Sequence, residues 1–125
     1  MQTNELTFGE FIKQKRKEKK MVGRELSAAA GITPEYLCEI EKGRKVAVSE
    51  GIMDKMIQAL LLTEEETARF YDLAAVARKT VSVSADLPEY IMSHELVRTA
   101  LRTAKKHNIP DEKWEKFIQE MVREG

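Results

Sequence analysis

The sequence predicts an all-α fold in which five short helices are followed by a two-helix extension. Apolar residues recur every three or four positions along most of the 125-residue chain, which is the spacing of a helix that buries one face. Threonine or serine precedes several of these segments and glycine follows others, as is usual at helix ends. The composition, 42% apolar and 34% charged, is typical of a soluble, helix-rich protein.

The first three helices are expected within the first 43 residues. The first covers about 7–19, where apolar residues recur at helical spacing. The second, 24–30, is rich in alanine and is followed by Gly31, a residue that often ends helices. The third begins after Thr33, whose hydroxyl can cap the free N–H groups, and ends at Gly43.

The fourth and fifth helices are predicted to follow Ser49 and Thr63, which are both suitable N-cap residues. Thr63 and Glu66 also have the spacing of a capping box. The apolar stripe of the fourth helix consists of Ile52, Met53, Met56, Ile57, Leu60 and Leu61. The buried face of the fifth helix is expected to hold Phe70, Leu73, Ala74 and Ala77.

The extension is expected to begin at residue 80, so that the chain divides into 1–79 and 80–125. Residues 80–88 are polar and β-branched and end in proline, which predicts an extended connector. Val81 and Val83 alternate with polar residues there, as in a short strand.

Two amphipathic helices are predicted after this connector, at 88–107 and after a break at 108–110. The first is expected to bury Leu96, Val97, Ala100, Leu101 and Ala104. The second carries an apolar stripe of Trp114, Phe117, Ile118, Met121 and Val122. This stripe has two interpretations: it packs on the fifth helix of its own chain, or it pairs with a second copy.

The third helix has two distinct faces when its residues are placed 100° apart. Leu37 and Ile40 define the buried side. The opposite side carries Glu35, Glu39 and Lys42. Glu41 lies at the edge of the buried side, where a carboxylate needs a basic partner within the fold, and Arg16 is the expected partner.

Residues 8–45, "FGEFIKQKRKEKKMVGRELSAAAGITPEYLCEIEKGRK", resemble the Cro and lambda-repressor (XRE-like) class of helix–turn–helix proteins. The features that carry the resemblance are Arg16, Leu26-Ser27-Ala28, Gly31-Ile32-Thr33, Tyr36-Leu37, Ile40-Glu41 and Lys42-Gly43-Arg44. The resemblance covers about residues 7–62. It implies a five-helix, repressor-like domain that usually acts as a dimer on a two-fold DNA site, with the third helix in the major groove.

This resemblance implies two sets of DNA contacts. Bases are expected to be contacted by Thr33, Glu35, Tyr36 and Glu39. Phosphates are expected to be contacted by Lys19, Lys20, Gly23, Arg24, Lys42, Arg44 and Lys45. The sequence departs from the family pattern at Val22-Gly23, where Ser/Thr-Gln is usual, at Cys38, where serine is common, and at Glu39, where a basic or amide side chain is common.

The charge distribution agrees with this interpretation. The net charge is zero, yet residues 1–45 hold ten basic and seven acidic side chains, so that the excess of positive charge lies in the N-terminal half. A solvated helix face would also explain the basic run at 13–20. Nothing in the sequence suggests export or a membrane span, and the lone Cys38 favours the reducing cytoplasm.

Catalytic and metal chemistry is not expected. His94 and His107 stand alone, without the spacing of metal ligands, and no phosphate-binding glycine loop is present, so that neither an enzyme nor a cofactor is predicted.

Two functions follow from the sequence. The first is a DNA-binding transcriptional regulator, a repressor of bacterial or phage type, that forms a homodimer on double-stranded DNA. The residues expected at the dimer interface are Trp114, Phe117, Ile118 and Met121. The second is a scaffold that binds a protein partner, as an antitoxin or a phage-encoded inhibitor does, with Glu35 and Glu39 facing a basic surface.

Overall fold

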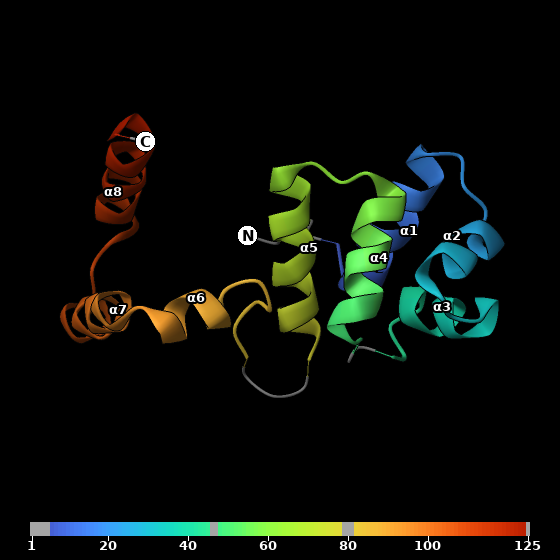
Figure 1. Cartoon of the computed structure of the whole chain (residues 1–125), viewed down its shortest axis with the longest axis horizontal. Coiled ribbons are helices and arrows are strands. Elements are labelled where there is room, and N and C mark those ends of the chain that lie inside the picture. The colour runs from blue at the N-terminus through green and yellow to red at the C-terminus, as the bar shows by residue number, and fades with distance from the viewer. Residues whose placement is uncertain (1–5, 46–47, 79–81, 125) are drawn as a thin grey trace. The chain divides into compact units, whose positions relative to one another are not determined.

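The computed structural model describes residues 6–45, 48–78 and 82–124, and over those ranges it has eight helices and no strand (Figure 1). The helices are α1 (Phe8–Glu18), α2 (Gly23–Ala30), α3 (Pro34–Glu41), α4 (Glu50–Leu60), α5 (Glu64–Ala77), α6 (Pro88–Ser93), α7 (Glu95–His107) and α8 (Asp111–Glu124). The predicted all-α class is therefore confirmed.

The chain forms two compact units, Met1–Leu87 and Pro88–Gly125. The sequence suggested a division at residue 80, but the described residues 82–87 belong to the first unit. The Ser84 hydroxyl donates a hydrogen bond to the Asp72 carboxylate on α5, and Ala85 packs against the core. These contacts hold the segment on α5. Val81 lies outside the described residues.

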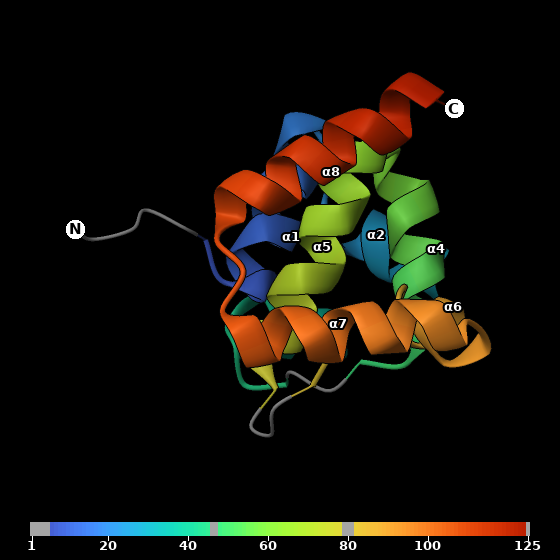
Figure 2. The same cartoon turned by 90° about the vertical axis from the view of Figure 1, so that its left-hand side faces the viewer.

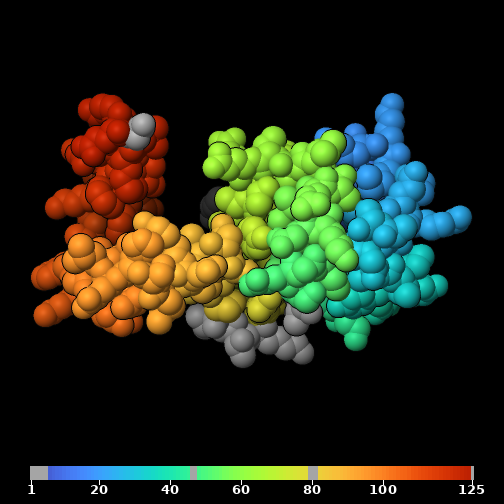
Figure 3. All heavy atoms as spheres, viewed as in Figure 1, coloured from blue at the N-terminus to red at the C-terminus, as the bar shows by residue number. Residues whose placement is uncertain are grey.

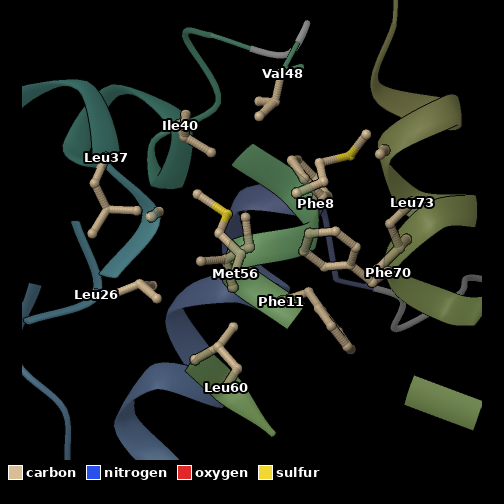
Figure 4. Close-up of a cluster of buried hydrophobic side chains, with 14 residues drawn as sticks. Phe8, Phe11, Leu26, Leu37, Ile40, Val48, Met56, Leu60, Phe70 and Leu73 are labelled. Carbon is tan, nitrogen blue, oxygen red and sulfur yellow. The ribbon is translucent and has the colours of Figure 1, made fainter. Parts of the chain in front are cut away.

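The first unit is built around one apolar core to which all five of its helices contribute (Figure 4). α1 packs against α3 and α5, while α2 packs against α3 and α4. The ring centroids of Phe8 and Phe70 lie 5.0 Å apart, so that an aromatic pair joins α1 to α5. The fully buried core side chains are Phe11, Ile12, Leu26, Leu37, Ile40, Met53, Met56, Leu60 and Phe70.

The predicted N-caps are present at α3, α4 and α5. The hydroxyls of Thr33 and Ser49 each accept a backbone N–H, and Thr63 forms the expected capping box with Glu66. Leu61 differs from the prediction. It ends α4 in the left-handed conformation, with φ 52°, and its side chain is 70% exposed, because that backbone conformation turns it away from the buried face.

The second unit has three helices, whereas the sequence predicted two. The expected helix at 88–107 is interrupted at His94, which has an extended backbone, and this break separates α6 from α7. Local hydrogen bonds stabilise the break. The Arg98 guanidinium donates to the carbonyl oxygens of Ile91 and Met92, and the ring Nδ1 of His94 lies 2.8 Å from the carbonyl oxygen of Tyr90.

The second unit contains no buried side chain among its described residues. The prediction that Leu96, Val97, Ala100, Leu101 and Ala104 are buried was therefore wrong for this chain taken alone, and Leu96 is 83% exposed. α7 and α8 diverge from the turn that joins them (Figure 2), and Leu101 on α7 and Phe117 on α8 remain 42% and 48% exposed. No helix within the described ranges is long and apolar enough to cross a membrane.

Candidate nucleic-acid interface

α3 is fixed to the first unit by its inner face. The side chains of Leu37 and Ile40 are 2% and 1% exposed and point into the core, as their spacing predicted (Figure 4). Thr33 caps the helix start, and Pro34 occupies the first turn, where its missing N–H has no consequence. The inner face of α3 is thus anchored at two positions one turn apart.

A glycine on α1 sets the distance between α1 and the end of α3. A Cβ at Gly9 would lie 2.6 Å from the carbonyl oxygen of Glu41 and closer still to that of Ile40. Only a residue without a side chain permits this approach, which explains a glycine inside a helix despite its cost of about 0.5–1 kcal/mol relative to alanine.

The end of α3 is also tied to α1 by the ion pair expected between Arg16 and Glu41. Arg16 Nε and Nη2 donate to the two carboxylate oxygens at 2.9 and 3.0 Å. Its Nη1 donates to the carbonyl oxygen of Met21 at 3.0 Å, in the turn before α2. The hydrogen bonds to Glu41 raise the pKa of Arg16 above its ordinary value, so that the guanidinium stays charged.

The outer face of α3 carries the residues predicted to contact bases. Glu35 and Cys38 are exposed, while Tyr36 and Glu39 are half-buried. Tyr36 also packs against the edge of the core, and the Thr33 hydroxyl is already engaged as the cap. Of the predicted set, Glu35 is therefore the exposed acid, and Glu39 is half-buried beside it on the same helix.

The residues predicted to contact phosphate come from the segments that flank α3. The α1–α2 turn and the start of α2 supply Lys19, Lys20, Gly23 and Arg24, and the turn after α3 supplies Lys42, Arg44 and Lys45. All six basic side chains are exposed. α2 and α3 lie next to each other on the surface of the first unit (Figure 3).

The turn after α3 brings Glu39 and Arg44 together. The N–H of Arg44 donates to the carbonyl oxygen of Glu39 at 2.9 Å, and the N–H of Gly43 donates to that of Ile40 at 3.0 Å, with Gly43 at φ 83°. This is the Schellman arrangement, which places these two side chains in contact. Arg44 Nη1 lies 3.1 Å from Glu39 Oε2.

The start of α2 is occupied by a carboxylate of the chain itself. The N–H of Val22 donates to Glu25 Oε1 at 2.9 Å, and Val22 has no side-chain acceptor of its own. This carboxylate stands close to the N–H groups of α2, where the resemblance implied a phosphate near Gly23. Glu25 is thus a competing anion at this position.

Two residues that shape this face were not identified from the sequence. Gly9 carried a signal, since a glycine within an amphipathic helix often marks a close approach of two backbones. Glu25 carried a weaker signal. An acid three residues after the N-cap position can accept the N–H of that position, as in a capping box, even when the N-cap residue is valine.

Comparison with known proteins agrees with this geometry. A family model described as "Helix-turn-helix" matches residues 12–66. Residues 12–66 therefore match a helix–turn–helix domain, which agrees with the resemblance of this segment to the Cro and lambda-repressor class. In this domain α2 and α3 are the two motif helices, and α3 is the one that the class places in the major groove.

One solved structure is similar over most of the chain. It belongs to a SinR protein/SinI protein complex, is 21% identical, and aligns over 94% of this chain and 97% of that chain with a TM-score of 0.47. No curated protein sequence matches this chain. Over the ranges that the structure describes, no group of histidine, cysteine and acidic side chains is arranged to hold a metal ion.

Proposed function

We propose that this chain is a sequence-specific DNA-binding regulator of transcription that binds a two-fold operator as a homodimer and represses by occupying it. The observation that carries the proposal is the helix–turn–helix domain, in which α3 is anchored by Leu37 and Ile40 and presents an exposed outer face. The proposed activity is binding in the cytoplasm, and it requires neither catalysis nor a cofactor.

The two kinds of side chain around α3 have different tasks in this proposal. The exposed lysines and arginines neutralise phosphates, which supplies most of the affinity and makes binding dependent on salt. Glu35 and Glu39 select bases, because a carboxylate accepts a hydrogen bond from the N4 amino group of cytosine. Carboxylates near phosphates also weaken binding to every other sequence, so that the domain discriminates strongly.

The second unit is proposed to form the dimer. It is shorter than the about 40 residues that a chain usually needs to fold without disulfides, metals or a partner, and none of its described residues has a buried side chain. α7 and α8 border a hollow of about 330 Å³ lined by Ala100, Ala104, Trp114 and Phe117 among others. A second copy would cover these apolar surfaces.

The charges of the two long helices favour a second copy of this unit over an unrelated partner. α7 carries four basic side chains and one acidic one, whereas α8 carries five acidic and three basic. A two-fold axis that places α7 of one protomer beside α8 of its partner pairs opposite charges at two equivalent positions. The predicted interface residues Trp114, Phe117, Ile118 and Met121 all lie on α8.

A second candidate function is protein binding through the same face. The Glu25 carboxylate at the start of α2 and the absence of the usual glutamine clamp both weaken a phosphate contact there, and they favour a basic partner protein. The two functions are compatible, since a DNA-binding antitoxin performs both.

A gel-shift assay with the full chain tests the proposal. The probes are the DNA upstream of its own coding sequence and a scrambled duplex of the same composition, at two salt concentrations. We expect selective retardation of the first probe that weakens as salt increases. Arg24→Ala should weaken binding to both probes and reduce the salt slope by about 0.9 per protomer, whereas Arg69→Ala, a control on α5, should change neither.

Two outcomes would contradict the proposal. Equal retardation of both probes would leave only non-specific binding, and the absence of retardation would favour the protein-binding alternative. The dimer is tested separately by sedimentation. Ile118→Glu places a charge on a side chain that is 52% exposed in the single chain, so that it should convert a dimer to a monomer without unfolding the first unit.

A further inference from the structure

We propose that the Glu39–Arg44 ion pair couples base recognition to phosphate binding. Arg44 becomes available to a phosphate only when Glu39 finds a hydrogen-bond donor on a base. This inference rests on the proposed function and adds a mechanism of specificity to it.

The pair is imposed by the backbone. The carbonyl oxygen of Glu39 accepts the N–H groups of both Arg44 and Lys45, at 2.9 and 3.3 Å, and Gly43 provides the left-handed residue that the turn requires. The side chains of Glu39 and Arg44 therefore face each other before any ligand arrives. An arginine placed for a phosphate contact is already bound to a carboxylate.

The pair is nevertheless easy to open. The Arg44 side chain is 63% exposed and that of Glu39 34%, and ion pairs at such positions contribute little net stability. A phosphate can therefore compete with Glu39 for the guanidinium. Whether this exchange is favourable depends on whether a base offers the Glu39 carboxylate a hydrogen-bond donor.

Glu39 lies on the same outer face as Glu35, which the proposed function directs toward bases. If Arg44 moves to a phosphate, the Glu39 carboxylate is left beside a polyanion without a positive partner. A base that presents an amino group, as cytosine does, restores a hydrogen bond to that carboxylate. Opposite a base without such a donor, the exchange is unfavourable, so that Arg44 stays with Glu39 and the phosphate contact is not made.

Salt dependence measures this coupling directly, because each phosphate contact contributes about −0.9 to the slope of log K against log salt. The probes are a duplex selected from a randomised pool by the wild-type full chain and a scrambled duplex of the same composition. For the wild type, we expect the slope on the selected duplex to be steeper by about 0.9 per protomer than on the scrambled one. In Glu39→Gln, Arg44 is free on both duplexes, so that this difference should disappear and affinity for the scrambled duplex should increase about tenfold.

Glu35→Gln is the matched control. It removes the same charge from the same face, but Glu35 forms no ion pair within the described residues. As a base-reading residue it should lose part of the preference for the selected duplex, but the difference in slope should remain, because the slope counts phosphate contacts and Arg44 is still paired with Glu39. Circular dichroism of each variant checks that the helices are retained.

The outcomes separate this inference from the function on which it rests. A difference in slope that persists in Glu39→Gln, or that disappears equally in Glu35→Gln, overturns the coupling and leaves DNA binding intact. A pool that yields no preferred sequence overturns the proposed function, and the coupling with it.

Discussion

The guanidinium of Arg16 and the carboxylate of Glu41 form a two-point ion pair that joins α1 to the last turn of α3. Their side chains are only 13% and 10% exposed. Planar, two-point pairing is specific to arginine among the basic residues. The pair therefore fixes the end of the helix that carries the candidate DNA-binding face, and it does so from the opposite side.

Loss of this pair should destabilise the first unit strongly. Arg16→Met leaves a mostly buried carboxylate without a partner, and we expect the free energy of unfolding to fall by about 3 kcal/mol in urea denaturation. Lys17→Met is the matched control, since it removes an exposed positive charge from the next position of α1 and should change stability by less than about 0.5 kcal/mol. Equal effects of the two substitutions would show that the pair contributes no more than a surface charge.

The close approach of α1 and α3 gives a second prediction. Gly9→Ala forces a Cβ against two backbone carbonyl groups of α3, so that the two helices must separate, and we expect a loss of about 3 kcal/mol or more. Gly51→Ala in α4 meets no atom within 4 Å and should stabilise by about 0.5–1 kcal/mol. Thermal unfolding of both variants measures these changes in stability. A Gly9→Ala variant as stable as the wild type would contradict the close approach of α1 and α3.

Leu61 provides a third prediction, in which removal of an apolar side chain is favourable. Its φ of 52° is costly for a residue with a Cβ, and its side chain is largely exposed. Leu61→Gly should therefore raise the free energy of unfolding by about 1 kcal/mol. The neighbouring Leu60 is fully buried, and Leu60→Ala should lower it by roughly 2–5 kcal/mol. A lower free energy of unfolding in Leu61→Gly would contradict the left-handed backbone conformation of Leu61 at the end of α4.

The hydroxyl of Tyr71 should titrate at a higher pH in the folded protein than in the unfolded chain. Burial, together with the hydrogen bond that its hydroxyl donates to Asp54 at 3.1 Å, raises the pKa of Tyr71 to about 12. Because the folded pKa lies above the value of about 10 expected for an unfolded tyrosine, this contribution to stability is complete below pH 10 and is lost as the pH rises toward 12. The absorbance change at 295 nm in the wild type minus that in Tyr71→Phe measures it. A difference signal that titrates near pH 10 would contradict this hydrogen bond.

The Lys15–Glu66 ion pair, which joins α1 to α5 at 2.9 Å, should make the stability of the first unit depend on pH in the acid range. The hydrogen bond from Lys15 lowers the pKa of Glu66 below its ordinary value. The pair therefore contributes stability above the unfolded pKa of a glutamate, and this contribution is lost as the pH falls through the lower, folded value. Glu66→Gln keeps the capping role of the side chain but removes the charge, so that stability should decline less between neutral and acid pH. An unchanged decline would assign the acid sensitivity to other carboxylates.

The sequence by itself determined most of the first unit. Its helices begin at Thr33, Ser49 and Thr63 as expected, because capping is a local interaction between a hydroxyl and N–H groups two or three residues ahead. The buried positions of α3 and the Arg16–Glu41 pair also followed from helical spacing, since a charged residue at the edge of a buried face needs a partner.

Only the tertiary structure decided the features that depend on contacts between distant segments. The approach of Gly9 to α3 and the attachment of Ser84 to α5 join residues that are far apart in the sequence, and no local pattern specifies them. The break at His94 was missed because hydrogen bonds from one arginine side chain, that of Arg98, outweigh the helical spacing of the apolar residues around it. An apolar stripe indicates that a helix face needs covering, whereas what covers it is set by the rest of the fold or by a partner, and within the single chain the stripes of α7 and α8 stay largely exposed.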